Sequence, residues 1–225
     1  LCYTSGTTGN PKGALYSHRS TVLHALTTSL NLGPSLGDGM KVLPVVPLFH
    51  VNAWGLPYAA PLTGTSLIFP GPNLDGASLF DLMDQENVNS AWGVPTVWLG
   101  LLEEIRKQER VPSQFQNVVI GGSAAPKSMI EEFESLGITV CHAWGMTEMS
   151  PVGTQGFLPG SMKKALSQDE QISKKCYQGR RVFGVDLKIV DENDNSLPHD
   201  GIASGELYVR GNAIISGYYK NNEAT

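Results

Sequence analysis

The sequence predicts an α/β fold in which a sheet with crossover helices is followed by a β-rich segment. Two patterns support this prediction. Between residues 21 and 145, short apolar runs typical of buried strands alternate with helix-length segments, several of which open on a capping residue or a proline. From Gly179 onward, apolar and polar residues alternate around Asp, Asn and Gly turns, which is typical of hairpins. The first pattern favours strands joined by helices, and the second favours a separate β-rich unit.

The helices and strands can be placed from local signals. Asp75 is a favoured N-cap residue, and Pro95 and Pro126 stand where proline fits the start of a helix. Helices are therefore expected at residues 21–31, 76–85, 95–108 and 126–135. The intervening runs are short and apolar, which indicates buried strands. These strands are expected at residues 41–49, 65–69, 88–93, 116–122 and 138–145.

A charged region separates the two units. Residues 161–175 contain four lysines, one aspartate and one glutamate, so we expect an exposed helix or loop that serves as a solvated connector. The predicted division is an α/β core at residues 1–176 and a β-rich unit at residues 177–225. Because the chain begins without Met inside a glycine-rich loop and stops before a further element is complete, we interpret it as an internal fragment.

Composition argues against several classes of protein. The chain has 225 residues and a net charge of −5 without a dense basic run, which argues against a nucleic-acid partner. Its three cysteines form no CxxC motif, so we expect a reduced compartment, the cytoplasm, and not a disulfide scaffold. The uncharged stretch at residues 42–74 is interrupted by prolines, so it is not expected to be a transmembrane helix.

The opening stretch, YTSGTTGNPKGALYSHRS at residues 3–20, predicts a site for an anion with several oxygens. Its glycines leave backbone N–H groups accessible, its threonine and serine hydroxyls add donors, and Lys12 supplies a compact charge that suits phosphate. A purely structural Gly/Thr-rich turn is the alternative. The stretch is not a Walker A motif, because Lys12 is followed by glycine and not by serine or threonine.

The order Thr-Ser-Gly-Thr-Thr-Gly-x-Pro-Lys-Gly resembles the phosphate loop of the adenylate-forming superfamily, which includes acyl-CoA synthetases, adenylation domains and luciferases. Four later segments are similar to family blocks and follow in the family's order: PLFHVNAWG (47–55), GGSAAP (121–126), HAWGMTE (142–148) and GELYVRGNAIISGYY (205–219). Within the superfamily, the chain most resembles bacterial medium- and long-chain fatty acid CoA ligases. The resemblance implies the core of the large N-terminal domain, followed by a barrel-like β-rich segment. It also implies that the C-terminal lid domain lies beyond Thr225.

The resemblance implies a reaction with ATP, Mg²⁺ and CoA, in which a fatty acid forms an acyl-adenylate and then a thioester. Lys12, Thr147 and Glu148 would be catalytic, and Thr4 and Glu148 would bind Mg²⁺, which prefers oxygen ligands. An ordinary strand-end carboxylate is the alternative for Glu148. The residues implied to contact the phosphates are Thr4, Ser5, Gly6, Thr7, Thr8, Gly9 and Lys12. The residues implied to contact adenosine are Ser123, Ala124, Ala125 and Pro126 on one side and Ala143, Trp144, Gly145, Met146, Thr147 and Glu148 on the other.

Two positions depart from the family pattern. Trp144 stands where the family usually has tyrosine, so the aromatic face that would stack on adenine is kept and the phenol is lost. A buried core tryptophan is the alternative. Arg181 stands where close relatives often have proline, and the sequence gives it no functional interpretation.

The acyl site is expected at His50, Trp54 and Gly122. Amino-acid-activating relatives have an aspartate near this block, whereas residues 42–74 contain no acid, and an unpaired ammonium group there would be costly. We therefore expect an apolar carboxylic acid as the substrate, and by resemblance Trp54 gates a fatty-acyl tunnel. A satisfied core histidine is the alternative for His50.

Three functions follow for the protein. The first is a fatty acid CoA ligase, with a possible homodimer in the full-length protein. The second is a CoA ligase for a short thioether acid of the methylthiopropionate type. The third is a homologue that binds nucleotide without turnover, which the presence of both Lys12 and Glu148 argues against.

Overall fold

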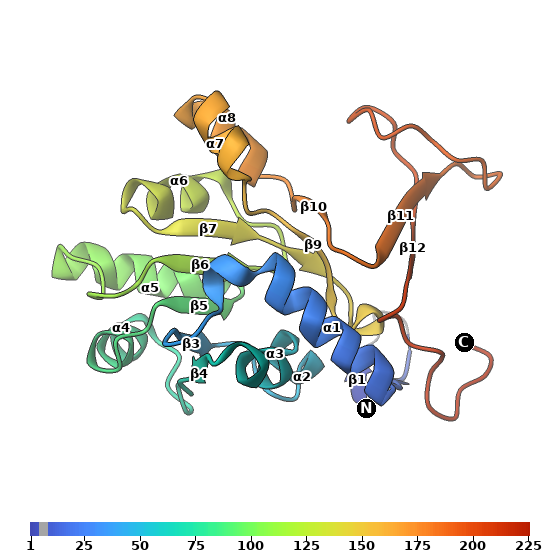
Figure 1. Ribbon diagram of the computed structural model, residues 1–225, viewed down its shortest axis with the longest axis horizontal. Helices are drawn as coiled ribbons and strands as arrows, with labels where there is room; N and C mark the ends of the chain where they lie inside the picture. Colours follow the sequence, from blue (N-terminus) through green and yellow to red (C-terminus); the bar gives the residue numbers. More distant parts are fainter. Residues whose placement is uncertain (5–8) are drawn as a thin grey trace.

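The computed structural model describes residues 1–4 and 9–225, and its centre is a five-stranded parallel sheet (Figure 1). The strands lie in the order β4-β3-β5-β6-β7, so the chain adds β4 on one side of β3 and all later strands on the other. This confirms the predicted α/β class. The strands are β3 (Lys41–Pro44), β4 (Ser66–Leu67), β5 (Ser90–Gly93), β6 (Asn117–Ile120) and β7 (Thr139–His142).

The two faces of this sheet pack into separate parts of the core. Neighbouring residues of a strand point to opposite faces, and in four strands one neighbour belongs to each buried cluster. Strands buried on both faces read as continuous apolar runs, which explains the sequence pattern. The neighbouring pairs are Val42 and Leu43, Ala91 and Trp92, Val118 and Val119, and Val140 and Cys141.

Helices cover both faces of the sheet (Figure 1). On one face, α4 (Gly76–Gln85), α5 (Pro95–Gln108) and α6 (Lys127–Ser135) bury Phe80, Trp98 and Phe133. On the other face, α3 (Leu56–Thr63) packs beside α1 (His18–Asn31). A short 3₁₀ turn, η1 (Gly33–Ser35), follows α1.

Two capping residues fix where helices begin. As predicted, Asp75 caps α4, and its carboxylate accepts a hydrogen bond from the Ser78 N–H at 3.0 Å. Helix α1 begins three residues before the predicted start at residue 21, because the Ser17 hydroxyl accepts a hydrogen bond from the Ser20 N–H at 3.0 Å.

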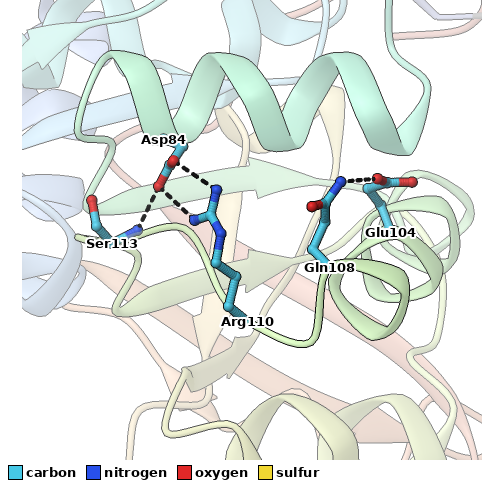
Figure 2. A network of polar contacts seen from close by, with 5 residues as sticks. All are labelled: Asp84, Glu104, Gln108, Arg110 and Ser113. Atoms are coloured by element: carbon cyan, nitrogen blue, oxygen red, sulfur yellow. Dashed lines mark hydrogen bonds and ion pairs between the residues drawn. The ribbon is translucent and has the colours of Figure 1, made fainter.

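Polar contacts fix the turn that ends α5. Glu109 adopts a left-handed conformation with φ of 52° directly after the helix. Arg110 then donates two hydrogen bonds to the carboxylate of Asp84 in α4, and the Ser113 N–H donates to the same group (Figure 2). These contacts join the end of α5 to the end of α4.

The predicted strand at residues 41–49 is shorter than expected, because β3 ends at Pro44. The chain then forms one left-handed helical turn, α2 (Val51–Trp54), with φ between 47° and 57° at all four residues. Left-handed backbone costs non-glycine residues roughly 1–2 kcal/mol each, so local propensity does not predict this turn.

The predicted strand at residues 138–145 is divided between two sheets. Strand β7 ends at His142 in the main sheet, and β8 (Trp144–Gly145) pairs with β9 (Val152–Gln155) in a second, antiparallel sheet. The 3₁₀ turn η2 (Thr147–Met149) joins these two strands, and β10 (Arg180–Arg181) pairs with the far edge of β9.

The prediction of a solvated connector at residues 161–175 was wrong for its second half. The region forms α7 (Gly160–Ala165) and α8 (Gln168–Lys175). Ile172 packs into the core, and Lys175 is 1% exposed and forms an ion pair with Glu134 of α6. Burial lowers the pKa of Lys175, and Glu134 opposes this shift.

The last part of the chain contains the predicted hairpin, formed by β11 (Val185–Val190) and β12 (Glu206–Gly211) (Figure 1). The described residues do not close this hairpin into the predicted barrel-like unit. Arg181 acquires a structural role here, since its guanidinium donates to the Val185 carbonyl at 2.9 Å and to Asp186 at 2.5 Å. Among the described residues, no helix has both the length and the apolar character needed to cross a bilayer.

Candidate functional site

A cavity of about 560 Å³ lies beyond the carboxyl ends of β6 and β7, where ligands bind in many open α/β sheets. Strands β1 (Cys2–Thr4) and β2 (Lys12–Ala14), together with η2, supply further walls. Most of the predicted site residues line it. The lining residues are Thr4, Lys12, His50, Val51, Trp54, Gly121, Gly122, Ala143, Trp144, Gly145, Met146, Thr147, Glu148, Pro151, Val152 and Tyr218.

Strand pairing places the first two polar groups of the cavity. Strands β1 and β2 are antiparallel, and their register sets Thr4 opposite Lys12. The threonine hydroxyl and the lysine ammonium therefore enter the site from neighbouring positions. The predicted phosphate ligands between these strands, Ser5, Gly6, Thr7 and Thr8, lie outside the described residues.

Glu148 supplies the negative charge of the cavity and is held by the C-terminal part of the chain. Its Oε1 accepts a hydrogen bond from the Tyr218 hydroxyl at 2.6 Å, and its backbone carbonyl accepts one from the Ile215 N–H at 2.9 Å. Burial raises the pKa of Tyr218 to about 12, and Glu148 adds to the shift. Sequence reasoning assigned no role to Tyr218, although this residue lies within the recognised segment at residues 205–219.

Tyr16, near the start of the chain, also contacts η2. Its hydroxyl donates a hydrogen bond to the Thr147 carbonyl at 2.7 Å. Burial, with smaller contributions from Cys2 and Glu148, raises the pKa of Tyr16 well above its usual range, so the hydroxyl keeps its proton and remains a donor. This residue was also missed, because an aromatic residue within a glycine-rich stretch gives no signal of a partner 131 positions away.

Trp54 forms an apolar wall against the two glycines that follow β6. A Cβ at Gly121 would lie 3.1 Å from the Trp54 ring and 3.2 Å from the Ala143 carbonyl oxygen. Gly122 has φ of 79°, which disfavours other residues. Trp54 is 8% exposed, whereas His50, which precedes α2, is exposed. The structure thus brings His50, Trp54 and Gly122 to one cavity, and their contact with an acyl chain stays a prediction.

Close backbone contact explains why residue 145, which lies just before η2, is a glycine. A Cβ at Gly145 would lie 2.0 Å from the Pro151 carbonyl oxygen across the β8-β9 pair. Trp144, the preceding residue, lines the cavity and is only partly buried. The structure therefore places an aromatic side chain at the cavity, and its stacking on adenine stays a prediction.

One predicted group does not line the cavity. Residues 123–126 continue from Gly122, and the Ala125 N–H donates to Nε2 of the buried His142 at 3.2 Å. Their contact with adenine, and the phosphate contact of Gly9, stay predictions. Among residues 1–4 and 9–225, the predicted site residues that do not line this cavity are Gly9, Ser123, Ala124, Ala125 and Pro126.

The donor set of the cavity fits a magnesium ion shared with a nucleotide. The described residues contain no cluster of three His, Cys, Asp or Glu side chains that would hold a metal by themselves. Magnesium is commonly held by one or two carboxylates together with substrate phosphates and water. Glu148 and the Thr4 hydroxyl supply oxygen ligands of this type at the same cavity.

Comparison with known proteins gives one family. The family described as AMP-binding enzyme matches residues 1–219. A medium-chain fatty acid CoA ligase of Ectopseudomonas oleovorans is 51% identical over 223 residues, which cover 99% of this chain and 41% of that protein. A 3-methylmercaptopropionyl-CoA ligase of Ruegeria lacuscaerulensis is 49% identical over 98% of this chain and 41% of its own length.

A solved structure shows the same fold. The inhibitor-bound N-terminal domain of FACL13 from Mycobacterium tuberculosis superposes with a TM-score of 0.83 at 23% identity, over 99% of this chain and 52% of that one. The chain thus spans about two fifths of the length of these curated relatives.

Proposed function

Since this chain belongs to the AMP-binding enzyme family, we propose that it forms the nucleotide- and acyl-binding core of a fatty acid CoA ligase. One observation carries the proposal: a single cavity combines Lys12 and Glu148 with an apolar wall formed by Val51 and Trp54. A triphosphate needs the charged groups, and an alkyl chain needs the apolar wall. The names of the relatives at 51% and 49% identity agree with CoA ligation.

In the proposed reaction, the fatty acid carboxylate attacks the α-phosphate of ATP and pyrophosphate leaves. The CoA thiol then attacks the acyl carbon, and AMP leaves. Lys12 would neutralise charge on the phosphates, and Trp144 would stack on the adenine. Glu148 and Thr4 would hold magnesium, which supplies charge stabilisation for phosphoryl chemistry. The protein contributes mainly position and electrostatics to such a step.

The acyl end of the cavity favours an uncharged substrate tail. Residues 42–74, which include His50 and Trp54, contain no Asp, Glu, Lys or Arg. A substrate ammonium would lose its hydration without gaining a partner from this segment. An alkyl chain would gain about 0.8 kcal/mol for each buried methylene, or about fourfold in affinity.

The short thioether acid remains a second candidate, because the Ruegeria relative is almost as similar as the medium-chain ligase. Both substrates have a carboxylate and an uncharged tail, so the polar end of the cavity serves either one. The depth of the apolar end distinguishes them. The predicted division at residue 176, a cytoplasmic location and a homodimer of the whole protein stay predictions.

Acid-dependent exchange between ATP and pyrophosphate, measured on the whole protein, tests the function. We expect exchange with butyrate, hexanoate and octanoate, with kcat/KM rising along the series by about fourfold per methylene until the pocket ends. Trp54→Ala should change this profile more than it changes the KM for ATP, since Trp54 belongs to the apolar wall.

Three results would change the assignment. An optimum at methylthiopropionate would select the thioether acid, and a preference for amino acids would reject both acyl substrates. Nucleotide binding without exchange for any acid would indicate a homologue that binds without turnover.

A further inference from the structure

A C-terminal segment binds both polar elements of the cavity. We name residues 213–219 the bridging segment. On one side, the Ile215 N–H donates to the Glu148 carbonyl at 2.9 Å, and the Ser150 hydroxyl donates to the Ala213 carbonyl at 2.6 Å. On the other side, the Tyr219 N–H donates to the Gly13 carbonyl at 2.8 Å. The bridging segment therefore connects η2 with β2, the strand that carries Lys12.

Tyr218 extends this connection to the charged side chains. Its hydroxyl donates to Glu148 Oε1 at 2.6 Å, and its ring centroid lies 5.4 Å from the Lys12 ammonium. The second distance is within the range of a cation–π contact. One aromatic side chain thus contacts both the Glu148 carboxylate and the Lys12 ammonium.

Lys12 and Glu148 have opposite charges, yet within the described chain Glu148 forms no ion pair with Lys12. A direct ion pair between them would neutralise both groups and withdraw them from a ligand. The hydroxyl of Tyr218 instead uses one oxygen of Glu148, and a carboxylate has four acceptor sites. Tyr218 gives the only hydrogen bond that the described residues donate to this carboxylate, so among them the remaining acceptor sites are available to a cation.

We propose that Tyr218 is a positioning residue that keeps Lys12 and Glu148 apart and correctly oriented for a nucleotide and its magnesium ion. The proposal rests on the proposed function, because it needs a triphosphate at Lys12 and a cation at Glu148. It assigns the two contacts to different parts of one side chain. The hydroxyl orients the carboxylate, and the ring holds the ammonium.

Two substitutions separate these parts. Tyr218→Phe keeps the ring and removes the hydroxyl, whereas Tyr218→Leu removes both. The matched control is Tyr219→Phe, at a neighbouring tyrosine that is 45% exposed and does not line the cavity. Each variant is made in the whole protein, and its thermal unfolding without ligand shows whether it folds.

Calorimetric titration with ATP, in the presence of magnesium and in the presence of EDTA, is the measurement. We expect Tyr218→Phe to weaken binding of magnesium ATP by about tenfold, the size of a hydrogen bond to a charged group, and to leave metal-free ATP binding unchanged. Tyr218→Leu should weaken both, because Lys12 is then free to pair with Glu148. Tyr219→Phe should change neither. Equal affinities for Tyr218→Phe and the unmodified protein would overturn the proposal.

Glu148→Ala distinguishes this inference from the proposed function. If Glu148→Ala does not alter magnesium ATP binding, the metal assignment fails and the role of Tyr218 fails with it. If Glu148→Ala weakens binding and Tyr218→Phe does not, only the positioning role is rejected. Combining the two substitutions gives the decisive result: no further loss supports the proposal, and fully additive losses reject it.

Discussion

Lys12 is positioned by strand pairing, since it lies opposite Thr4 in the β1-β2 pair and lines the cavity beside Glu148. We predict that Lys12→Ala lowers kcat/KM for ATP in the whole protein by about ten- to hundredfold, because a hydrogen bond to a charged group contributes about 1.5–3 kcal/mol. Steady-state kinetics at varied ATP measure this. Lys127→Ala is the control, since Lys127 is exposed and pairs with Glu131 on the surface. Unchanged ATP kinetics for Lys12→Ala would contradict the phosphate role.

A second prediction at the residue scale concerns Gly145. A Cβ there would lie 2.0 Å from the Pro151 carbonyl oxygen, so Gly145→Ala must separate β8 from β9. We expect a loss of about 1–3 kcal/mol in the free energy of unfolding, as in other overpacked sites, measured by urea denaturation. Gly160→Ala is the control, because a Cβ at Gly160 meets nothing within 4 Å. Equal stability of the two variants would show that the strand pair adjusts without cost.

The polar centre of the site was predictable only in part. Lys12 and Glu148, which both line the cavity, were predicted as site residues because they lie in segments that resemble family motifs and follow in the same order. Tyr16 and Tyr218 were not, because their hydroxyls act on partners 131 and 70 positions away. A single sequence contains no signal for such distant contacts between an aromatic hydroxyl and an oxygen acceptor.

At the scale of elements, α5 ends in a conformation that does not suit its residue. Glu109 is exposed and has φ of 52°, a left-handed position that glycine adopts without a Cβ penalty. We predict that Glu109→Gly raises the free energy of unfolding by about 1 kcal/mol. Lys107→Gly, inside the same helix, should lower it by about 1 kcal/mol. Urea denaturation compares the two, and a loss for both variants would contradict this account of the α5 terminus.

Elements were predictable where local signals and tertiary packing agree. The apolar strands of the main sheet and the helices opened by Asp75 and Pro95 were confirmed because burial and capping favour the same structure. The left-handed turn at α2 was missed because Val51 and Trp54 do not favour it locally. Helix α8 was interpreted as solvated because most of its residues are charged or polar. Its composition does not predict that Ile172 packs into the core or that Lys175 forms an ion pair with Glu134.

At the scale of the whole molecule, the apolar runs predict a sheet that is buried on both faces. They do not predict the contacts that join distant segments. His24 is one such contact. It is 2% exposed, and its Nε2 accepts a hydrogen bond from the Val152 N–H at 3.1 Å, which connects α1 with β9. A Cβ at Gly55 would lie 2.7 Å from the imidazole, so α3 begins directly against the same ring.

The burial of His24 predicts how the stability of the molecule depends on pH. Burial lowers the pKa of His24 from 6.5 to about 4, so between these values the unfolded chain binds more protons than the folded one. The contribution of neutral His24 to stability is complete above pH 6.5 and is lost as the pH falls towards 4.

From pH 7 to pH 5 we expect the protonation of His24 in the unfolded chain to lower the free energy of unfolding by about 2 kcal/mol. Urea denaturation at a series of pH values measures the slope. His24→Gln keeps an acceptor for Val152 and cannot titrate, so between pH 7 and pH 5 its free energy of unfolding should fall by about 2 kcal/mol less. Equal slopes for the two proteins would contradict a lowered pKa of His24 in the folded protein, because a protonated Nε2 cannot accept the hydrogen bond from Val152.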